Sequence, residues 1–427
     1  MLLLYGHRPV YIVLFMFMAT MSWTPTVLAD ARIPLTIAEA EDLAVASEPG
    51  IAALLARSDA AQEEAVAAEQ LPDPTLRFGL GNFPISGGSF STEGMTQAQL
   101  GFRQTFPRSR ARDLAGETMR AEGDAYLQRA EARRREILYE VRRAWLEVYF
   151  TQTAWTLVNE SRPFFDDLVT ITRSMYGVGR KSQHDVLRAE LELSRLDDRL
   201  IDITRKRDEA RAALSRWLGE DARRPLAQGL PAWNAPPSTS DLQLSVAVHP
   251  LLLASEAYVA AREAAVGKAE EDKRPGWALD VGYGYRDGFL PSGEPRSDFV
   301  SVAVTVDMPF FGSNRQDRRL SAALSERSAA RDERAELQAR LLSELQAEDA
   351  RLSQLSRRLA LYDDRILEQS KAQARAALLA YQSDTGDFAD VMRSYIDELN
   401  TRLDHIRLRV DRAQSHAALA SLGGFQL

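Results

Sequence analysis

The chain has no cysteine, few histidines and no excess of positive charge. Without cysteine it can form no disulfide, offer no thiolate to a metal and carry no lipid on an N-terminal cysteine. Five histidines in 427 residues leave little material for a histidine metal cage. Lysine and arginine total 53 against 61 aspartates and glutamates, a formal net charge of −8, so nucleic acid is not expected as a partner.

Long hydrophobic runs are also scarce, and the first one has the form of a leader. His7 and Arg8 precede an apolar run from Val10 to Met21, and Val27-Leu28-Ala29 offers small or apolar residues at −3 and −1. We interpret residues 1–29 as a secretory signal cleaved between Ala29 and Asp30. The alternative is an uncleaved anchor, which the shortness of the apolar run disfavours.

The rest of the chain repeats its own order of features. Pro49 and Pro74 are matched by Pro250 and Pro275, both displaced by 201 positions, and an alanine-rich helical pattern lies between the prolines of each pair. Strand patterns and long charged helical patterns follow in both halves. We interpret this order as an internal duplication. The first repeat is assigned to residues 30–235 and the second to 236–427, joined through the Pro/Ser-rich segment 231–240.

The helical segments have the 3.5-residue spacing of helices that pack side by side over a long distance. Steps of three and four from Val186 reach mostly apolar residues as far as Trp217, and the same steps from Ala389 reach only apolar residues as far as Ala420. The segments from Pro107 to Tyr176 and from Pro309 to Tyr381 are long enough for helices of roughly 100 Å. The sequence therefore predicts an elongated molecule.

Four segments alternate apolar and polar residues with a period of two, in hairpins at 75–107 and 276–310. Each alternating run has about the length of a tilted transmembrane strand. Aromatic residues gather in these hairpins, and we expect some of them to form an interfacial girdle: Phe78, Phe102, Phe106, Trp277, Tyr283, Tyr285 and Phe299. The alternative is a pair of amphipathic hairpins that cover a soluble core. Because four strands cannot close a barrel, strands in lipid would require several chains to share one.

With these features, the sequence resembles the TolC-like outer-membrane efflux proteins over the whole mature chain. Three segments are most similar to the branch that works in heavy-metal efflux of the Czc and Cus kind: 71–79, 93–97 and 104–107. The resemblance implies a mixed α+β membrane protein, a homotrimer with a shared outer-membrane β-barrel and a periplasmic α-barrel. It also implies a periplasmic adaptor and an inner-membrane pump of the resistance-nodulation-division class. The resemblance further implies a passive channel that needs no cofactor.

The resemblance also implies functional roles for two places where the helical pattern is interrupted. Val178-Gly179-Arg180 and Asp384-Thr385-Gly386 are predicted hairpin tips, because glycine lets a helix reverse. In the family such tips contact the adaptor. Val178-Gly179 resembles the family's Val-Gly motif, although Arg180 replaces its usual leucine.

The periplasmic gate is predicted to lie beside the second tip, with Asp390 as its principal charged residue. Asp390-Val391-Met392 resembles the family segment that carries two gate aspartates, with Arg393 at the second position and Asp387 as a neighbour. The alternative is that Asp390 only caps a helix.

No pattern in the sequence indicates an enzyme or a metal site, and heavy-metal cations are expected as cargo rather than as ligands. An organic-compound efflux channel is the alternative function. A structural coiled-coil protein of the envelope and a periplasmic adaptor are further readings, and the two helical hairpins with membrane-type strands disfavour the adaptor.

Overall fold

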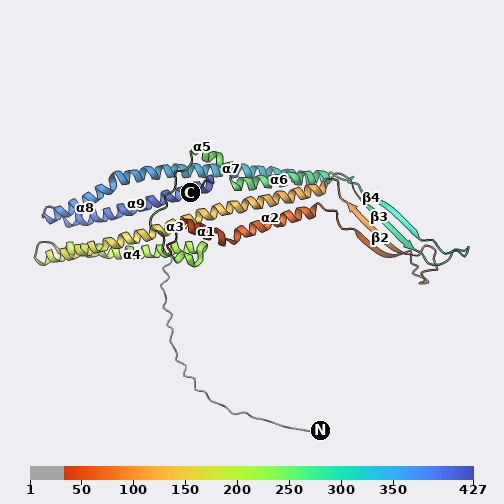
Figure 1. Cartoon of the computed structure of the whole chain (residues 1–427), viewed down its shortest axis with the longest axis horizontal. Helices are drawn as coiled ribbons and strands as arrows, with labels where there is room; N and C mark the ends of the chain where they lie inside the picture. The colour runs from red at the N-terminus through yellow and green to blue at the C-terminus, as the bar shows by residue number, and fades with distance from the viewer. Residues whose placement is uncertain (1–32) are drawn as a thin grey trace, which may run out of the picture.

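Long helices run along one axis of the molecule, and a four-stranded sheet extends from one end of them (Figure 1). The computed structural model describes residues 33–427, so the predicted signal at 1–29 lies outside the described residues. The first half contains α1 (Ile37–Ser47), α2 (Pro49–Ala68), β1 (Thr75–Gly81), β2 (Gln97–Phe106), α3 (Ala111–Gly177), α4 (Gln183–Leu218) and the 3-10 turn η1 (Gly219–Arg223). The second half contains α5 (Thr239–Val246), α6 (Pro250–Glu271), β3 (Gly276–Tyr285), β4 (Phe299–Asp307), α7 (Gln316–Leu361), the π-helical turn η2 (Tyr362–Ile366), α8 (Leu367–Gln382) and α9 (Phe388–Gly423).

The two halves place their elements in the same order. The ends of the long helices correspond at a constant displacement of 205 residues: Ala111 with Gln316, Gly177 with Gln382, Gln183 with Phe388, and Leu218 with Gly423. Pro49 and Pro250 each begin a helix, where a missing N–H costs nothing. The halves differ in one long helix, because α3 is continuous over 67 residues whereas η2 interrupts the run from α7 to α8.

The predicted apolar seams of α4 and α9 lie in the interior between the helices. On α4 the buried members are Val186, Ala189, Leu196, Ile203, Ala210, Leu214 and Trp217. On α9 they are Met392, Leu399, Leu403, Val410, Ala417 and Ala420. Leu196 and Ile203 belong to the same buried cluster as Leu399 and Leu403, together with side chains of α3. Burying these seams therefore joins the helical hairpin of the first half to that of the second.

A second buried cluster joins the start of the described chain to the middle of α3. Trp145 is fully buried, and its indole N–H donates a hydrogen bond to the Leu35 carbonyl at 3.2 Å. Leu35 also forms a parallel β-bridge with Leu226, which follows η1. Because a buried indole N–H needs an acceptor, this contact fixes the segment before α1 against the centre of α3.

One stretch of helix in residues 33–427 is long and apolar enough to cross a membrane by composition, Thr239–Glu271. It is not one straight helix, because α5 ends before the His249-Pro250 pair and α6 begins there. Helix α6 packs against α3 and α7. We therefore interpret it as part of the helical body.

His249 starts α6 and is neutral in the folded protein at neutral pH. Its side chain is 5% exposed, and its Nδ1 accepts a hydrogen bond from the Leu251 N–H at 3.2 Å. Burial, followed by the nearby positive charge of Arg135, lowers the pKa of His249 from 6.5 to about 4. Protonation would add a second positive charge there and remove the acceptor that caps α6.

We expect the free energy of unfolding to fall as the pH is lowered from about 6.5 towards 4, since the unfolded chain binds a proton that the folded chain excludes. The loss due to His249 should be about 2 kcal/mol. In His249→Asn, which keeps a side-chain acceptor for the cap but does not titrate, this pH dependence should be smaller. Denaturant unfolding at pH 7 and pH 5 measures it. Equal pH dependence in both proteins would show that His249 does not contribute.

Candidate functional site

The sheet has two faces of opposite character. All neighbouring strands pair antiparallel in the order β1-β2-β3-β4, and the β2–β3 pair joins the two halves of the chain. Residues that pair across strands share a face. One such row is Phe78, Leu100, Tyr283 and Val300, and the next polar row is Arg77, Gly101, Gly282 and Ser301. The alternation predicted from the sequence is therefore in register across all four strands.

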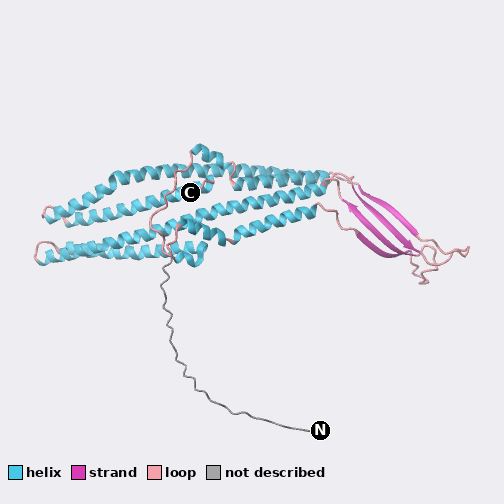
Figure 2. Cartoon of the chain, viewed as in Figure 1, coloured by secondary structure: helices cyan, strands magenta, loops and turns pink. Residues whose placement is uncertain are grey.

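No helix covers the apolar face of the sheet, which projects beyond the helical body (Figure 2). Phe78 and Val300 are the two ends of an apolar row, on the outer strands, and are 76% and 74% exposed. The Phe106 and Trp277 rings stack on this face with centroids 4.1 Å apart. The face carries six of the seven aromatic residues assigned to the girdle: Phe78, Phe102, Phe106, Trp277, Tyr283 and Tyr285.

The seventh aromatic residue predicted for the girdle, Phe299, lies on the polar face, so its assignment to the girdle is wrong. It pairs with Gly284 in the polar row, and the guanidinium of Arg286 lies 3.7 Å from its ring centroid. The alternation of β4 places Val300, Val302 and Val304 on the apolar face, so Phe299 is one residue out of phase.

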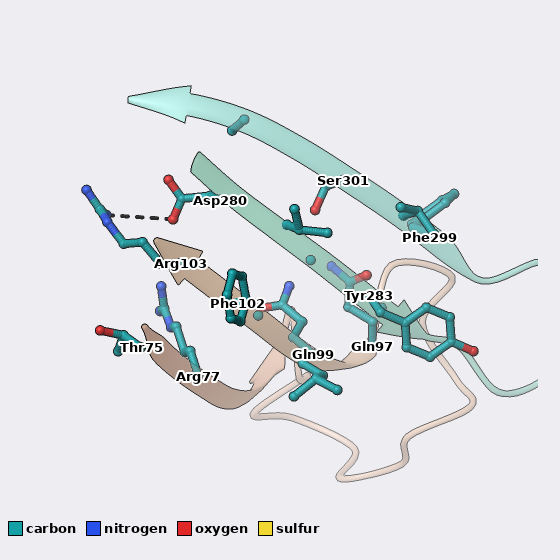
Figure 3. A pocket seen from close by; sticks show the side chains of 17 residues that line it. Thr75, Arg77, Gln97, Gln99, Phe102, Arg103, Asp280, Tyr283, Phe299 and Ser301 are labelled. Atoms are coloured by element: carbon teal, nitrogen blue, oxygen red, sulfur yellow. Dashed lines mark ion pairs between the residues drawn. The ribbon is translucent and has the colours of Figure 1, made fainter. Parts of the chain in front are cut away.

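The polar face is hollowed and lined by long polar side chains (Figure 3). The hollow has a volume of about 530 Å³. Arg103 lies opposite Asp280 with an Nη1–Oδ1 distance of 3.7 Å, and the Thr305 hydroxyl donates to Asp280 at 3.1 Å. The sequence pattern located these residues on one face but did not single out their charges.

The first hairpin tip connects α3 to α4. Gly179 has φ +73°, and the Arg180 N–H donates to the Met175 carbonyl at 2.9 Å, which closes the end of α3. Val178 is 70% exposed at the end of the molecule. Ser182 and Asp185 then form a capping box at the start of α4.

The second tip connects α8 to α9, and its backbone reverses direction with a different geometry from that of the first tip. Its left-handed residue is Asp384, with φ +58°, and not Gly386. Glycine at 386 is required for another reason: a Cβ there would lie 2.9 Å from the Cβ of Ala380. The N–H groups of Thr385 and Gly386 both donate to the Ala380 carbonyl, at 2.9 and 3.0 Å.

Lys181 joins the two tips, a role that no pattern in the sequence indicated. Its Nζ lies 3.2 Å from Asp384 Oδ1 and 4.5 Å from the centre of the Tyr381 ring. Tyr381 is buried, and its hydroxyl contacts Met175 Sδ at 3.4 Å. Burial raises the pKa of Tyr381, and the charge of Lys181 opposes that rise. The available signal was the rarity of lysine in a chain whose cations are mostly arginine.

The predicted gate residues lie at the start of α9. Asp387 is its N-cap residue but makes no side-chain cap hydrogen bond. Asp390 lies in the first turn, is exposed, and pairs with Arg393 at 3.4 Å. It makes no capping bond of the kind that Asp185 makes at the equivalent position of the first tip. The exposed pair of Asp390 and Arg393 is thus available to other molecules at the tip.

Among residues 33–427 no group of three or more histidine or acidic side chains is placed to hold a metal ion. The notable features of the described chain are thus the two-faced sheet and the paired tips.

Residues 41–220 match the sequence family described as "Outer membrane efflux protein". Proteins of this family are channels and not enzymes. No curated protein sequence matches the chain.

The fold is similar to that of several solved outer-membrane proteins. For the outer-membrane channel OprN the identity is 19%, the alignment covers 91% of this chain and 90% of that one, and the TM-score is 0.77. For CusC, whose structures describe transmembrane channel formation, the identity is 14%, the alignment covers 91% of this chain and 92% of that one, and the TM-score is 0.77. For the outer membrane protein VceC of Vibrio cholerae, the identity is 17%, the alignment covers 91% of this chain and 96% of that one, and the TM-score is 0.75. The chain therefore has the fold of outer-membrane efflux channels.

Removing the Lys181 ammonium should loosen the second tip. We expect Lys181→Ala to increase hydrogen exchange at the amides of Thr385 and Gly386 severalfold, because an exposed ion pair and a cation–π contact together contribute about 1 kcal/mol. Lys206→Ala is the matched control, since Lys206 makes a similar pair with Asp202 at 2.7 Å on the surface of α4. Unchanged exchange in Lys181→Ala would mean that the contact does not hold the tip.

Proposed function

We propose that the protein is the outer-membrane duct of a tripartite efflux system, exported by the leader at 1–29, and passively conducts substrates from the periplasm to the exterior. The observation that carries this proposal is the uncovered sheet. Its apolar face, interrupted by Gln104, has no protein partner among the described residues, its opposite face is polar, and each outer strand has an unpaired edge. A lipid-facing barrel wall with a wet interior requires these three properties together.

Three copies complete such a wall. Four strands are too few to enclose an interior, whereas three sheets joined edge to edge give a closed barrel of twelve. Joining β4 of one copy to β1 of the next removes every free edge. We therefore propose a homotrimer whose long helices form a tunnel below the barrel, on the periplasmic side.

The tips lie at the end of the helices farthest from the sheet (Figure 1). In an assembled duct this end reaches deepest into the periplasm. We propose that Val178, Gly179 and Arg180 of the first tip and Asp384, Thr385 and Gly386 of the second contact the periplasmic adaptor, which links the duct to an inner-membrane pump of the resistance-nodulation-division class. The exposure of Val178 supports this assignment, because a large apolar side chain at a helix end offers an apolar contact for a partner.

For the substrate we propose heavy-metal cations, on the resemblance of residues 71–107 to heavy-metal efflux channels. Efflux of organic compounds is the second candidate. The metal and drug tolerance of a strain that lacks the gene distinguishes the two.

We also propose that Asp390, with Asp387 and Arg393, forms the periplasmic gate. Convergence of three second tips on the trimer axis would bring three copies of the Asp390–Arg393 pair together. The exposure of both side chains supports this assignment, because they are free to face other copies.

Removing the Asp390 carboxylate should open the gate without unfolding the helix. We expect Asp390→Ala to raise the basal single-channel conductance in planar bilayers and to weaken block by multivalent cations from the periplasmic side. Thermal stability should change little, because Asp390 makes no cap hydrogen bond. Asp185→Ala is the matched control, since it removes a capping bond at the other tip and should lower stability by about 1 kcal/mol. If Asp390→Ala lowers stability and leaves conductance unchanged, the gate lies elsewhere.

A further inference from the structure

The polar face of the sheet carries an excess of positive charge at its centre. Arg77 and Arg103 lie on neighbouring strands, and Asp280 pairs with Arg103 (Figure 3). No acidic side chain among the described residues lies within salt-bridge distance of Arg77. Asp307 is the other acidic residue of the strands on this face. It lies in β4, four residues beyond Ala303, which pairs with Asp280. Asp307 is therefore about 13 Å along the strand from the row that contains Asp280 and Arg103.

The residues beside Arg77 leave its guanidinium accessible. Its row continues through Gly101, Gly282 and Ser301, so no long side chain lies across from it. The space at Gly101 is open enough for a Cβ, whose nearest neighbour would be the Arg77 Cβ at 3.6 Å. Arg77 is exposed on the face that the pore requires to be wet.

We propose that these residues form a positively charged belt inside the barrel, which favours anionic solutes, so that a heavy-metal cation passes more readily as an anionic complex than as the free ion. This inference rests on the proposed trimeric duct. Each copy contributes two arginines and one aspartate, so the belt has an excess of one positive charge per copy.

The dimensions of the barrel make this charge effective. Twelve strands about 4.8 Å apart and tilted by about 40° place the backbone roughly 12 Å from the axis. An extended arginine then brings its charge to about 6 Å from the axis, which is within the Debye length of about 8 Å at physiological salt. The belt thus acts on every solute that passes, and it biases passage without blocking it.

A single cysteine can report the sign of this potential, because the chain has no other thiol. In Gly101→Cys trimers in outer-membrane vesicles, we compare modification by a methanethiosulfonate that carries a sulfonate with modification by one that carries a quaternary ammonium. Both rates are normalised to those with a free thiol in solution. The anionic reagent should react about fourfold faster than the cationic one, and the ratio should approach one in 1 M salt.

Three further variants assign the effect to named residues. Arg77→Gln in the Gly101→Cys background should lower the ratio, and Asp280→Asn should raise it because Arg103 loses its partner. Leu100→Cys, one residue away on the apolar face, should react with neither charged reagent. Equal rates at Gly101→Cys, or a ratio that Arg77→Gln leaves unchanged, would overturn the belt and leave the duct intact. No reaction with either reagent would overturn the wet interior, and with it the proposed function.

Discussion

Backbone hydrogen bonding at the edges of the sheet is the constraint on which the proposed architecture depends. Strands β1 and β4 each have one unpaired edge, and their apolar side chains lie uncovered. In water such a sheet would aggregate, and in lipid its free N–H and C=O groups would each cost several kcal/mol. Pairing between copies satisfies both requirements at once. The proposed duct and its closed interior both depend on that pairing.

The duplicated chain uses its two halves differently. The equivalent helices α4 and α9 both have 36 residues, yet the first tip ends in a capping box whereas the start of α9 has no side-chain cap. The π-turn η2 also interrupts only the second half. Fewer local hydrogen bonds make a helix end easier to move. The asymmetry therefore agrees with a rigid first tip and a mobile second tip, held together by Lys181.

The sequence predicted most of the strands and helices, because their periodicity is local. The faces of the sheet follow directly from the alternation of Val300, Val302 and Val304, and Phe299, which was predicted for the girdle, is one residue out of phase with these valines and lies on the polar face. The left-handed conformation of Asp384 was missed because Gly386 was the obvious turn residue. Lys181 and Asp384 are 203 residues apart, so no local pattern could reveal their contact. The capping alternative for Asp390 also needed coordinates, because aspartate is favoured both as a helix cap and, through the helix dipole, in the first turn.

The pairing of β1 with β4 of a neighbouring copy is the central claim, and crosslinking measures it most directly. In this cysteine-free chain, Gly79→Cys in β1 is combined in turn with a cysteine at every polar-face position of β4, and the proteins are oxidised in the outer membrane: Phe299→Cys, Ser301→Cys, Ala303→Cys, Thr305→Cys and Asp307→Cys. Two cysteines bond only when their Cβ atoms come within about 4.5 Å. A closed barrel predicts that at least one pair yields covalent trimers on a denaturing gel, while Gly79→Cys alone yields monomers. Folded protein that remains monomeric with every pair would contradict the shared barrel.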